Sequence, residues 1–420
     1  MGGMSLVAGT IGRLRSAPRI AVLEPIEAGA TVLVFLLMSQ ALLGQLVESE
    51  PGSDGPAILR IMWLPVYALG LVWLLARPMP ALRSISRAPL MLVLAILCMV
   101  SATWSLDPGL SMRRGFAVVM TVLFGFAIAS RWDWKQLITL VAITNLILAV
   151  GSVLAILAVP SFGIQQEIHV GAWRGLWSEK NTLGAMMSYG MSASLGAAAV
   201  MPRRKLFWLG VTALQFGLVI MSTSKTGLLA ALLVAGGAIG IALVRRGFGF
   251  AALMIFALIL GGSLATIILT MAPVEFLEML GRDATLTGRT DIWEVLIGQV
   301  MDRPWTGYGY GAFWTVENGP VFWVRQATAW PVPTAHNGYL EVALGIGLPG
   351  LVLLMLVYLG TVGRAVGRLF RGREVYFLLT FFAVVTTVSI SESNLLNRNS
   401  LMWVLFVASA AKLAVKDDRV

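Results

Sequence analysis

Residues 137–159 read LITLVAITNLILAVGSVLAILAV, a mostly apolar run that contains no charged side chain. Because a helix needs about 20 such residues to cross the hydrocarbon core of a bilayer, this run predicts a transmembrane helix. Comparable runs lie near residues 26–47, 60–76, 89–104, 115–130, 183–200, 206–221, 227–244, 248–271, 338–362, 375–391 and 400–415. Together they predict an all-α polytopic membrane protein with about twelve transmembrane helices, in which residues 1–420 form a single integral membrane domain.

The composition supports this prediction and excludes several classes of protein. Hydrophobic residues make up 58% of the chain and charged residues only 12%, about half the share that is usual in soluble domains. This excludes a cytosolic enzyme, a disordered chain and a nucleic-acid-binding domain. The formal net charge of +10 reflects the excess of Lys and Arg that cytoplasmic loops of membrane proteins carry. We therefore expect the chain to contact a lipid bilayer and no nucleic acid.

Few side chains are suited to holding a metal ion. The chain has one cysteine, Cys98, and two histidines, His169 and His336. A single thiol excludes a disulfide framework and a thiolate metal site, and two histidines are too few for a histidine-built site. The sequence therefore predicts no metal and no other cofactor.

The Lys and Arg residues predict how the spans are oriented. With the N-terminus in the cytoplasm, every cytoplasmic loop carries at least two of them, for example Arg203 and Arg204, whereas acids such as Asp107 fall on the outer side. By the positive-inside rule, both termini of this multi-pass protein are cytoplasmic. The first run is too long and too poorly flanked for a cleaved signal peptide, so we expect it to be an anchor.

Several cations lie at the outer ends of spans, where the orientation rule does not require them. The most informative are Arg174, Lys180, Lys225, Arg282 and Arg289. A cluster of cations at the outer membrane face suits an anionic lipid-linked group such as a phosphate or pyrophosphate. For any one of them, a pair with a nearby acid or a lipid headgroup is an equally good explanation.

One outer loop, residues 272–335 between the ninth and tenth spans, is much longer than the others. Loops of this length usually have a function, and this one is too rich in aromatic residues to be disordered. Its Tyr308, Tyr310 and Trp314, together with Trp177 of the preceding outer loop, are candidates for stacking on sugar rings. The alternative is the belt of aromatic side chains found at membrane–water interfaces, which needs no ligand.

His336 ends this loop and opens the tenth span. A histidine at the outer end of a helix is well placed to accept a proton near neutral pH. A lone histidine is more often a structural residue, but this one shares the outer face with the cations described above. We therefore expect His336 to be a catalytic base.

Five segments resemble motifs of the O-antigen ligase and polymerase superfamily, and they follow one another along the chain in the same order as in that superfamily. Residues 336–350 pair His336-Asn337 with Gly347 and Gly350, and residues 173–184 (WRGLWSEKNTLG) are similar to the Arg-Gly…Lys-Asn-x-Leu-Gly stretch of the family. Residues 222–227, 287–293 and 307–314 also resemble segments of exopolysaccharide polymerases in this superfamily. The resemblance covers about residues 170–360. One departure is Glu179, because many relatives have a histidine before the lysine.

The resemblance implies a glycosyltransferase of the GT-C type in the bacterial inner (plasma) membrane, with residues 272–335 and the active site facing the periplasm. The implied donor is a glycan on undecaprenyl pyrophosphate, and no metal or nucleotide sugar is involved. Carried over by motif, Arg174 and Arg289 would clamp the pyrophosphate, with Lys180, Lys225 and Arg282 as weaker candidates. His336 would be the general base that activates the acceptor hydroxyl, and direct displacement would invert the anomeric carbon.

Three functions fit the sequence. The first is a polymerase that joins repeat units of an O-antigen or exopolysaccharide. The second is a ligase that moves the finished glycan onto lipid A–core. The third is a polysaccharide or lipid transporter without enzymatic activity, for which Glu341, about one turn into the tenth span, is the best support. A flippase and a chain-length regulator are the protein partners that the first function would suggest.

Overall fold

The computed structural model describes residues 23–46, 60–167, 169–252, 289–316, 318–328 and 332–415. These residues form helices joined by turns, and the β-structure among them is one isolated bridge between Ile164 and Trp173. The all-α, multi-pass membrane architecture predicted from the apolar runs is confirmed to this extent.

The first half of the described chain contains helices of very different length. They are α2 (Leu23–Met38), α3 (Leu43–Leu46), α5 (Leu64–Ala76), α6 (Pro78–Arg87), α7 (Pro89–Val100), the 3-10 helix η1 (Ser101–Trp104), α8 (Pro108–Arg131), α9 (Trp134–Ala158) and α10 (Pro160–Gly163). The second half contains α11 (Lys180–Val200), the 3-10 helix η2 (Pro202–Arg204), α12 (Lys205–Met221), α13 (Lys225–Val244), α16 (Arg289–Asp302), α17 (Pro320–Thr328), α18 (Gly338–Gly367), α19 (Val375–Ser391) and α20 (Leu401–Ala414).

Each apolar run that falls within the described residues coincides with an apolar helix or helix pair. Seven of these helices are long and apolar enough to cross a membrane, and an eighth span results if α5 and α6 are counted as one bent span. Three shorter apolar helices cover Pro89–Trp104, Val375–Ser391 and Leu401–Ala414. The run at 248–271 lies mostly outside the described residues. The total of twelve crossings therefore stays a prediction.

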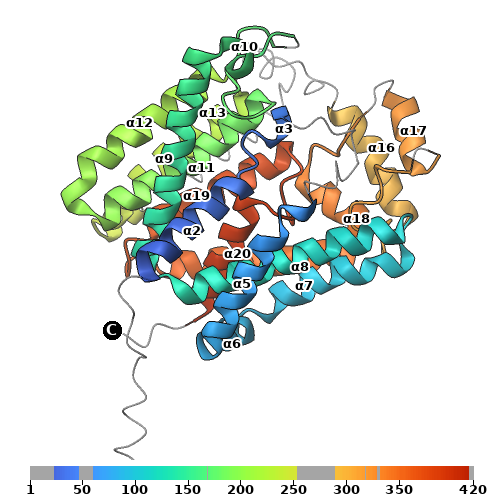
Figure 1. The fold of residues 1–420 in the computed structure, drawn as a ribbon, viewed down its shortest axis with the longest axis horizontal. Coiled ribbons are helices and arrows are strands. Elements are labelled where there is room, and N and C mark those ends of the chain that lie inside the picture. Colours follow the sequence, from blue (N-terminus) through green and yellow to red (C-terminus); the bar gives the residue numbers. More distant parts are fainter. Residues whose placement is uncertain are drawn as a thin grey trace, which may run out of the picture.

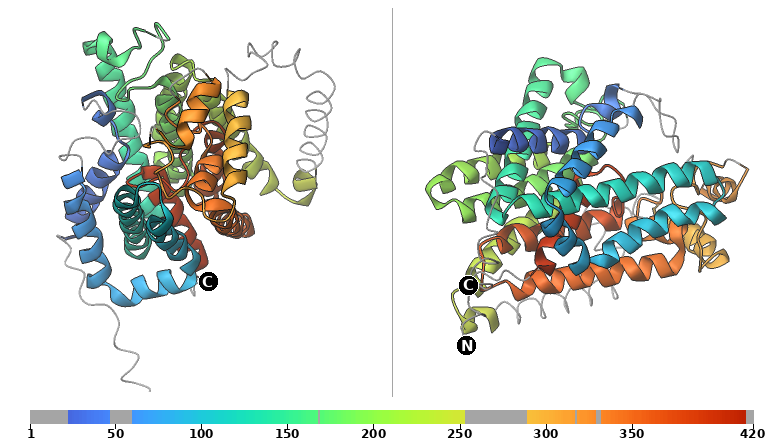
Figure 2. Two further views of the ribbon diagram at one scale, coloured as in Figure 1. Left: turned by 90° about the vertical axis from the view of Figure 1, so that its right-hand side faces the viewer. Right: turned by 60° about the horizontal axis from the view of Figure 1, so that its bottom comes forward.

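Helix α6 was not expected from the sequence. The chain turns by 102° between α5 and α6, and the turn lies at Pro78, whose ring cannot continue the hydrogen-bond pattern of the preceding helix. Figure 2 shows α6 lying across the direction of its neighbours. It buries Ala81 while Met79 and Leu82 stay exposed. Hydropathy alone does not reveal such a helix, because its apolar residues are too few for a span.

The helices form two groups with α19 and α20 between them (Figure 1). On one side α11 packs against α9, α12, α13 and α19, and on the other side α8 packs against α5, α7 and α20. Small residues allow the closest of these contacts: Gly115 of α8 lies against the backbone of Met99, and Gly125 lies against Val407 of α20. Close approach at glycines is typical of helices that pack within a membrane.

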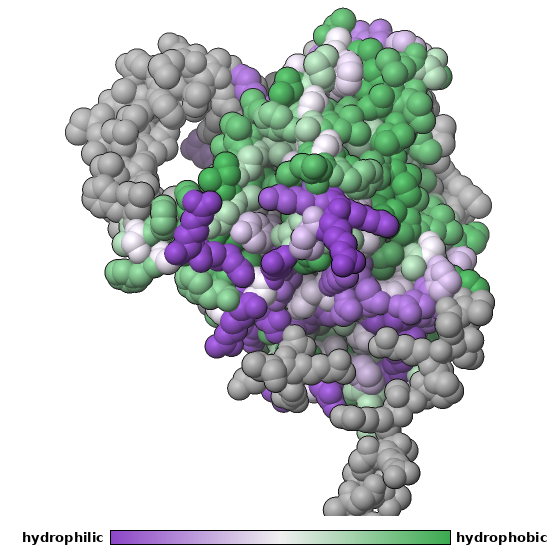
Figure 3. All heavy atoms as spheres, turned by 90° about the vertical axis from the view of Figure 1, so that its left-hand side faces the viewer, coloured by the Kyte–Doolittle hydropathy of each residue, from purple (hydrophilic) through white to green (hydrophobic). Residues whose placement is uncertain are grey.

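The outer surface of the bundle is largely apolar. Leu157 of α9 is 72% exposed and Leu206 of α12 is 84% exposed, which suits a lipid solvent and not water. Figure 3 shows one face on which a band of hydrophilic side chains borders a broad hydrophobic surface. This pattern supports the prediction that the chain is embedded in a bilayer.

Helix α18 is interrupted, and the segment after α16 fills the interruption. Gly347 has φ 73°, a conformation that residues other than glycine rarely adopt. At this break the Leu348 N–H donates to the Pro304 carbonyl at 2.7 Å, and the Tyr308 N–H donates to the Leu344 carbonyl at 2.7 Å. The glycine-rich segments 307–311 and 345–350 are therefore two halves of one contact. This contact fixes α16 and α17 beside α18 at one edge of the molecule (Figure 1).

Candidate active site

The start of α18 positions His336. Asn337 caps the helix, because its side-chain oxygen accepts hydrogen bonds from the N–H groups of Tyr339 at 2.9 Å and Leu340 at 3.1 Å. Just before the cap, His336 has φ 45°, in the left-handed region that residues other than glycine seldom adopt. Such strain is found where the surrounding structure holds a residue in a working position.

Glu392 links His336 to two other helices. Its Oε2 lies 3.7 Å from His336 Nδ1, and its Oε1 lies 3.4 Å from both Arg289 Nη2 and Asn181 Nδ2. The four residues come from the start of α18, the end of α19, the start of α16 and the start of α11. The Glu392 side chain is 24% exposed and that of His336 is 21% exposed, while both ring nitrogens of His336 are buried.

Arg289 is the first residue of α16 and is held from two directions. Besides its contact with Glu392, its Nη1 donates to the Ser391 carbonyl at 2.6 Å. That carbonyl belongs to the last turn of α19, where a helix carries partial negative charge. Helix α16 continues to Asp302, and Thr290 lies inside its first turn.

Lys180 and Lys225 begin α11 and α13. Lys180 Nζ donates to Thr223 Oγ1 at 3.3 Å, and the two lysines are close enough to repel each other. Thr226 accepts a hydrogen bond from Ser391 Oγ at 3.1 Å, which places the start of α13 beside the residue preceding Glu392. Two helix N-termini that each carry a lysine form a local environment suited to an anion.

The other two predicted cations are not joined to this group. Arg174 Nε donates to the Phe162 carbonyl at 2.9 Å and its Nη2 donates to the Ser161 carbonyl at 3.1 Å, so its guanidinium is bonded to α10. No contact within the described part of the chain connects Arg174 with His336 or Glu392. Arg282 lies outside the described residues. A pyrophosphate-binding role for either stays a prediction.

Glu341 connects three segments behind the site. Its carboxylate accepts hydrogen bonds from Trp314 Nε1 at 2.8 Å, from the Ala335 N–H at 3.0 Å and from Ser393 Oγ at 3.2 Å. Ala335 precedes His336 and Ser393 follows Glu392, so the same carboxylate positions both. These three bonds give a structural reason for an acid in a span, and they remove the main support for a transporter.

The predicted sugar-binding aromatics are mostly used inside the protein. The Tyr308 hydroxyl donates to the Gln299 carbonyl at 2.9 Å, and the Tyr310 hydroxyl donates to the Leu396 carbonyl at 2.7 Å. Burial raises the pKa of both phenols, and the charge of Asp302 raises that of Tyr308 further.

The two tryptophans are buried as well. Trp314 Nε1 donates to Glu341, and Trp177 Nε1 donates to the Ser39 carbonyl at 2.9 Å. Of the four aromatics, Trp177 lines a cavity beside Glu392. For all four, sugar binding stays a prediction.

Glu392 and Asn181 were not predicted as site residues. Residues 391–400 read SESNLLNRNS, and a carboxylate among amides and hydroxyls in a short outer turn between two apolar runs was the available signal. The partners of this turn lie far away in the chain; Arg289, for example, is 103 residues from Glu392. Among the described residues, no three His, Cys, Asp or Glu side chains are close enough to form a metal site.

Comparisons with known proteins follow the same segments. Residues 210–355 match the family described as O-antigen ligase, a region that includes Lys225, Arg289 and His336. The chain is also 26% identical, over 278 residues, to the exopolysaccharide production protein ExoQ of Rhizobium meliloti (strain 1021). That similarity covers 62% of this chain and 61% of the relative, so the chain spans about three fifths of the relative's length.

Proposed function

Because residues 210–355 match the family described as O-antigen ligase and the chain is similar to an exopolysaccharide production protein, we propose that it is a membrane glycosyltransferase acting on lipid-linked glycans. In this proposal the donor is a glycan on undecaprenyl pyrophosphate, and the site faces the periplasm from the bacterial inner membrane. The observation that carries the proposal is the contact of Glu392 with both His336 and Arg289, a proton acceptor and a cation. Glycosyl transfer from a pyrophosphate needs both groups.

His336 is the general base of the proposed reaction. Its Nδ1 faces Glu392, which favours the tautomer with the proton on Nδ1 and leaves the Nε2 lone pair for the acceptor hydroxyl. As the hydroxyl oxygen attacks the anomeric carbon, its proton moves to Nε2, and the carboxylate of Glu392 stabilises the imidazolium that forms. The new bond joins oxygen to the anomeric carbon, and direct displacement inverts that carbon.

The cations assist departure of the pyrophosphate. When the bond between the anomeric carbon and the phosphate oxygen breaks, negative charge develops on the leaving group. Arg289, Lys180 and Lys225 supply fixed positive charge at the starts of α16, α11 and α13. A guanidinium can contact phosphate oxygens in a bidentate manner, so we assign Arg289 the larger share.

Within this reaction class we favour polymerisation of repeat units. The similarity to a protein named for exopolysaccharide production supports this choice. Transfer of a finished glycan to lipid A–core is the second candidate, because the family matched by residues 210–355 is described as O-antigen ligase. The two differ in the acceptor and not in the residues required. Under polymerisation, a flippase and a chain-length regulator are the expected protein partners.

Mass spectrometry of undecaprenyl-linked glycans in a strain lacking this protein tests the proposal. Accumulation of single repeat units supports the polymerase, and accumulation of long chains on the carrier supports the ligase. A wild-type glycan profile, with normal surface polysaccharide, would contradict both. Complementation with the wild-type chain is the control, and complementation with His336→Ala should leave the accumulation in place.

A further inference from the structure

A cavity of about 190 Å³ opens beside Glu392, on the side of the site formed by α2, α11 and α20. Its polar lining includes Gln40, Asn181, Asn394 and Asn397. Its volume exceeds what a single water molecule needs, so a small polar ligand can enter. Glu392 belongs both to this cavity and to the contact with His336, so a ligand here would lie next to the reacting groups.

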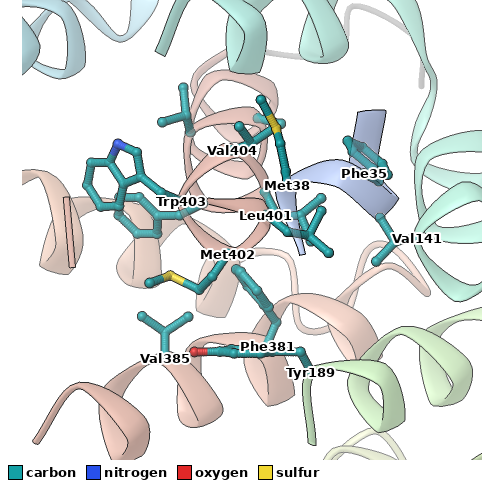
Figure 4. Close-up of a cluster of buried hydrophobic side chains, with 14 of the residues drawn as sticks. Phe35, Met38, Val141, Tyr189, Phe381, Val385, Leu401, Met402, Trp403 and Val404 are labelled. Carbon is teal, nitrogen blue, oxygen red and sulfur yellow. The ribbon is translucent and has the colours of Figure 1, made fainter. Parts of the chain in front are cut away.

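The floor of the cavity is apolar and tightly packed. Met38, Tyr189, Leu401 and Met402 form it, and Figure 4 shows these four side chains brought together from α2, α11 and α20. Trp177 adds an indole whose N–H is already bonded to a carbonyl. The cavity lining therefore combines apolar side chains with amide and hydroxyl groups, which is the composition expected of a small-molecule site.

One buried polar atom in this floor lacks a partner. Tyr189 is 5% exposed, and its hydroxyl makes no hydrogen bond to any residue that the structure describes. Its ring lies 5.7 Å from that of Phe381, so packing and not hydrogen bonding holds it in place. Figure 4 shows this hydroxyl oxygen beside Val385 of α19, so Tyr189 contributes its ring and not its hydroxyl to the cavity lining.

Asn394 and Asn397 lie in the turn between α19 and α20, and contacts of neighbouring residues hold this turn in position. Leu396, between them, accepts a hydrogen bond from the Tyr310 hydroxyl, and Asn399 accepts one from the Tyr67 hydroxyl at 2.9 Å. Leu396 and Asn399 also have positive φ values, 54° and 52°, so the turn has a defined shape. No hydrogen bond to the side-chain amide of Asn394 or Asn397 is found within the described part of the chain. A turn fixed in this way presents both amides without further ordering cost.

We propose that this cavity binds one neutral sugar ring of the glycan substrate. Amides and hydroxyls match the donors and acceptors of sugar hydroxyls, and the apolar floor matches the C–H surface of the ring. Among its described lining residues there is no lysine or arginine, and the one charged group is the carboxylate of Glu392. A uronic acid ring inside the cavity would therefore be disfavoured, whereas the donor pyrophosphate would lie outside the cavity, at Arg289, Lys180 and Lys225. This inference rests on the proposed function, because it names the substrate class at the same site.

Saturation-transfer NMR on the purified full-length protein in detergent tests the inference. The probes are methyl glycosides of glucose, galactose, mannose and N-acetylglucosamine, with methyl glucuronide as the charged comparison. We expect saturable binding of at least one neutral glycoside and binding of the glucuronide at least about tenfold weaker. Absence of binding by every neutral glycoside, or equal binding of the glucuronide, would overturn the proposal.

Variants locate the binding. Asn394→Ala combined with Asn397→Ala should weaken binding of the glycoside about tenfold. Asn318→Ala is the matched control, because Asn318 is an exposed asparagine in the turn before α17. Unchanged affinity in the double variant would place the ligand elsewhere and overturn the assignment.

Kinetics with a lipid-linked donor distinguish whether the bound sugar ring belongs to the donor or to the acceptor. A raised KM for the acceptor in the double variant assigns the ring to the acceptor, and a raised KM for the donor assigns it to the donor. A fall in kcat alone, with both KM values unchanged, contradicts a binding role. The binding assay is independent of the glycan profile of the deletion strain. Glycoside binding with a normal profile would refute the proposed reaction and leave the sugar site standing.

Discussion

The two ends of the helix bundle each have a glutamate between two basic residues, and the two arrangements differ. At one end Glu27 of α2 bonds Arg131 of α8 closely and lies 3.3 Å from Arg77, at the end of α5. At the other end Glu392 lies 3.4 Å from Arg289 and 3.7 Å from His336. Glu27 joins two permanent cations, whereas Glu392 joins one permanent cation and one group that can change its charge.

The surroundings of the two glutamates differ in the same sense. Arg131 is 9% exposed and also lies over the ring of Trp132, 4.0 Å from its centroid, so the Glu27 cluster is packed and closed. Glu392 contacts its partners at longer distances and lines an open cavity. We therefore propose that Glu27 has a structural role and that Glu392 takes part in the reaction. Four predictions test this distinction.

The largest effect is expected at His336. We expect His336→Ala to lower kcat for glycan transfer about 10²–10⁴-fold, the usual contribution of a general base. Donor binding and melting temperature should stay close to wild type, because the side chain is 21% exposed and does not fill the core. The measurement is transfer from a purified lipid-linked donor in nanodiscs. Turnover at the wild-type rate would show that the contact between Glu392 and His336 has only a structural role.

Arg289→Lys should be almost as damaging as Arg289→Ala. Lysine keeps the charge but loses the bidentate contact with phosphate and the bond to the Ser391 carbonyl. We expect kcat/KM to fall roughly 10²-fold in both variants, as on removal of one donor to a developing anion. If the lysine variant retains full activity, bulk charge suffices and the geometry at Glu392 is not required.

Glu392→Gln should lower kcat by about tenfold to a hundredfold, less than loss of the base itself, because His336 can still accept the proton. The amide keeps the size of the side chain but no longer stabilises an imidazolium. Glu392→Asp, which retains the charge on a shorter stem, should recover part of the activity. An equal loss of activity in the glutamine and aspartate variants, with a lowered melting temperature in both, would indicate that Glu392 has a structural role like that of Glu27.

The smallest effect on activity is expected at Glu27. Glu27→Gln leaves the sheltered guanidinium of Arg131 without its carboxylate, and it should lower the free energy of unfolding by about 1–2 kcal/mol. Transfer at temperatures where the protein is folded should stay within about twofold of wild type. The pair of measurements is a thermal melt in detergent and the same transfer assay. A large loss of transfer in a fully folded variant would erase the contrast between the two ends.

The apolar runs, the basic residues and the short motifs predicted much of this arrangement. The helices that cover runs such as 137–159 follow from length and apolarity, because each must satisfy its backbone hydrogen bonds within itself in a bilayer. His336 and Arg289 were also predicted as site residues, and the structure brings them to the same carboxylate.

Other features depended on contacts between distant parts of the chain. The amides and hydroxyls around Glu392 mark its turn but do not reveal its partners, just as the sequence does not reveal that Glu374, at the opposite end of α19, lies 3.1 Å from Arg368. The bonds of Arg174 to α10 and the burial of Tyr308 were likewise invisible, because side-chain type does not reveal the partner. Helix α6 was missed because its apolar residues are too few to register as a span.

The sequence by itself determined that the chain is a bundle of membrane helices, and its motifs indicated the superfamily and the candidate base. These features are local, since apolarity over some 20 residues and a few spaced side chains suffice to encode them. Only the tertiary structure decided that Glu392 contacts His336 and Arg289, that Glu341 bonds the neighbours of His336 and Glu392, and that a cavity without lysine or arginine in its described lining opens beside them. The physical reason is that these contacts form between helix ends far apart in sequence, and packing of the whole bundle brings those ends together.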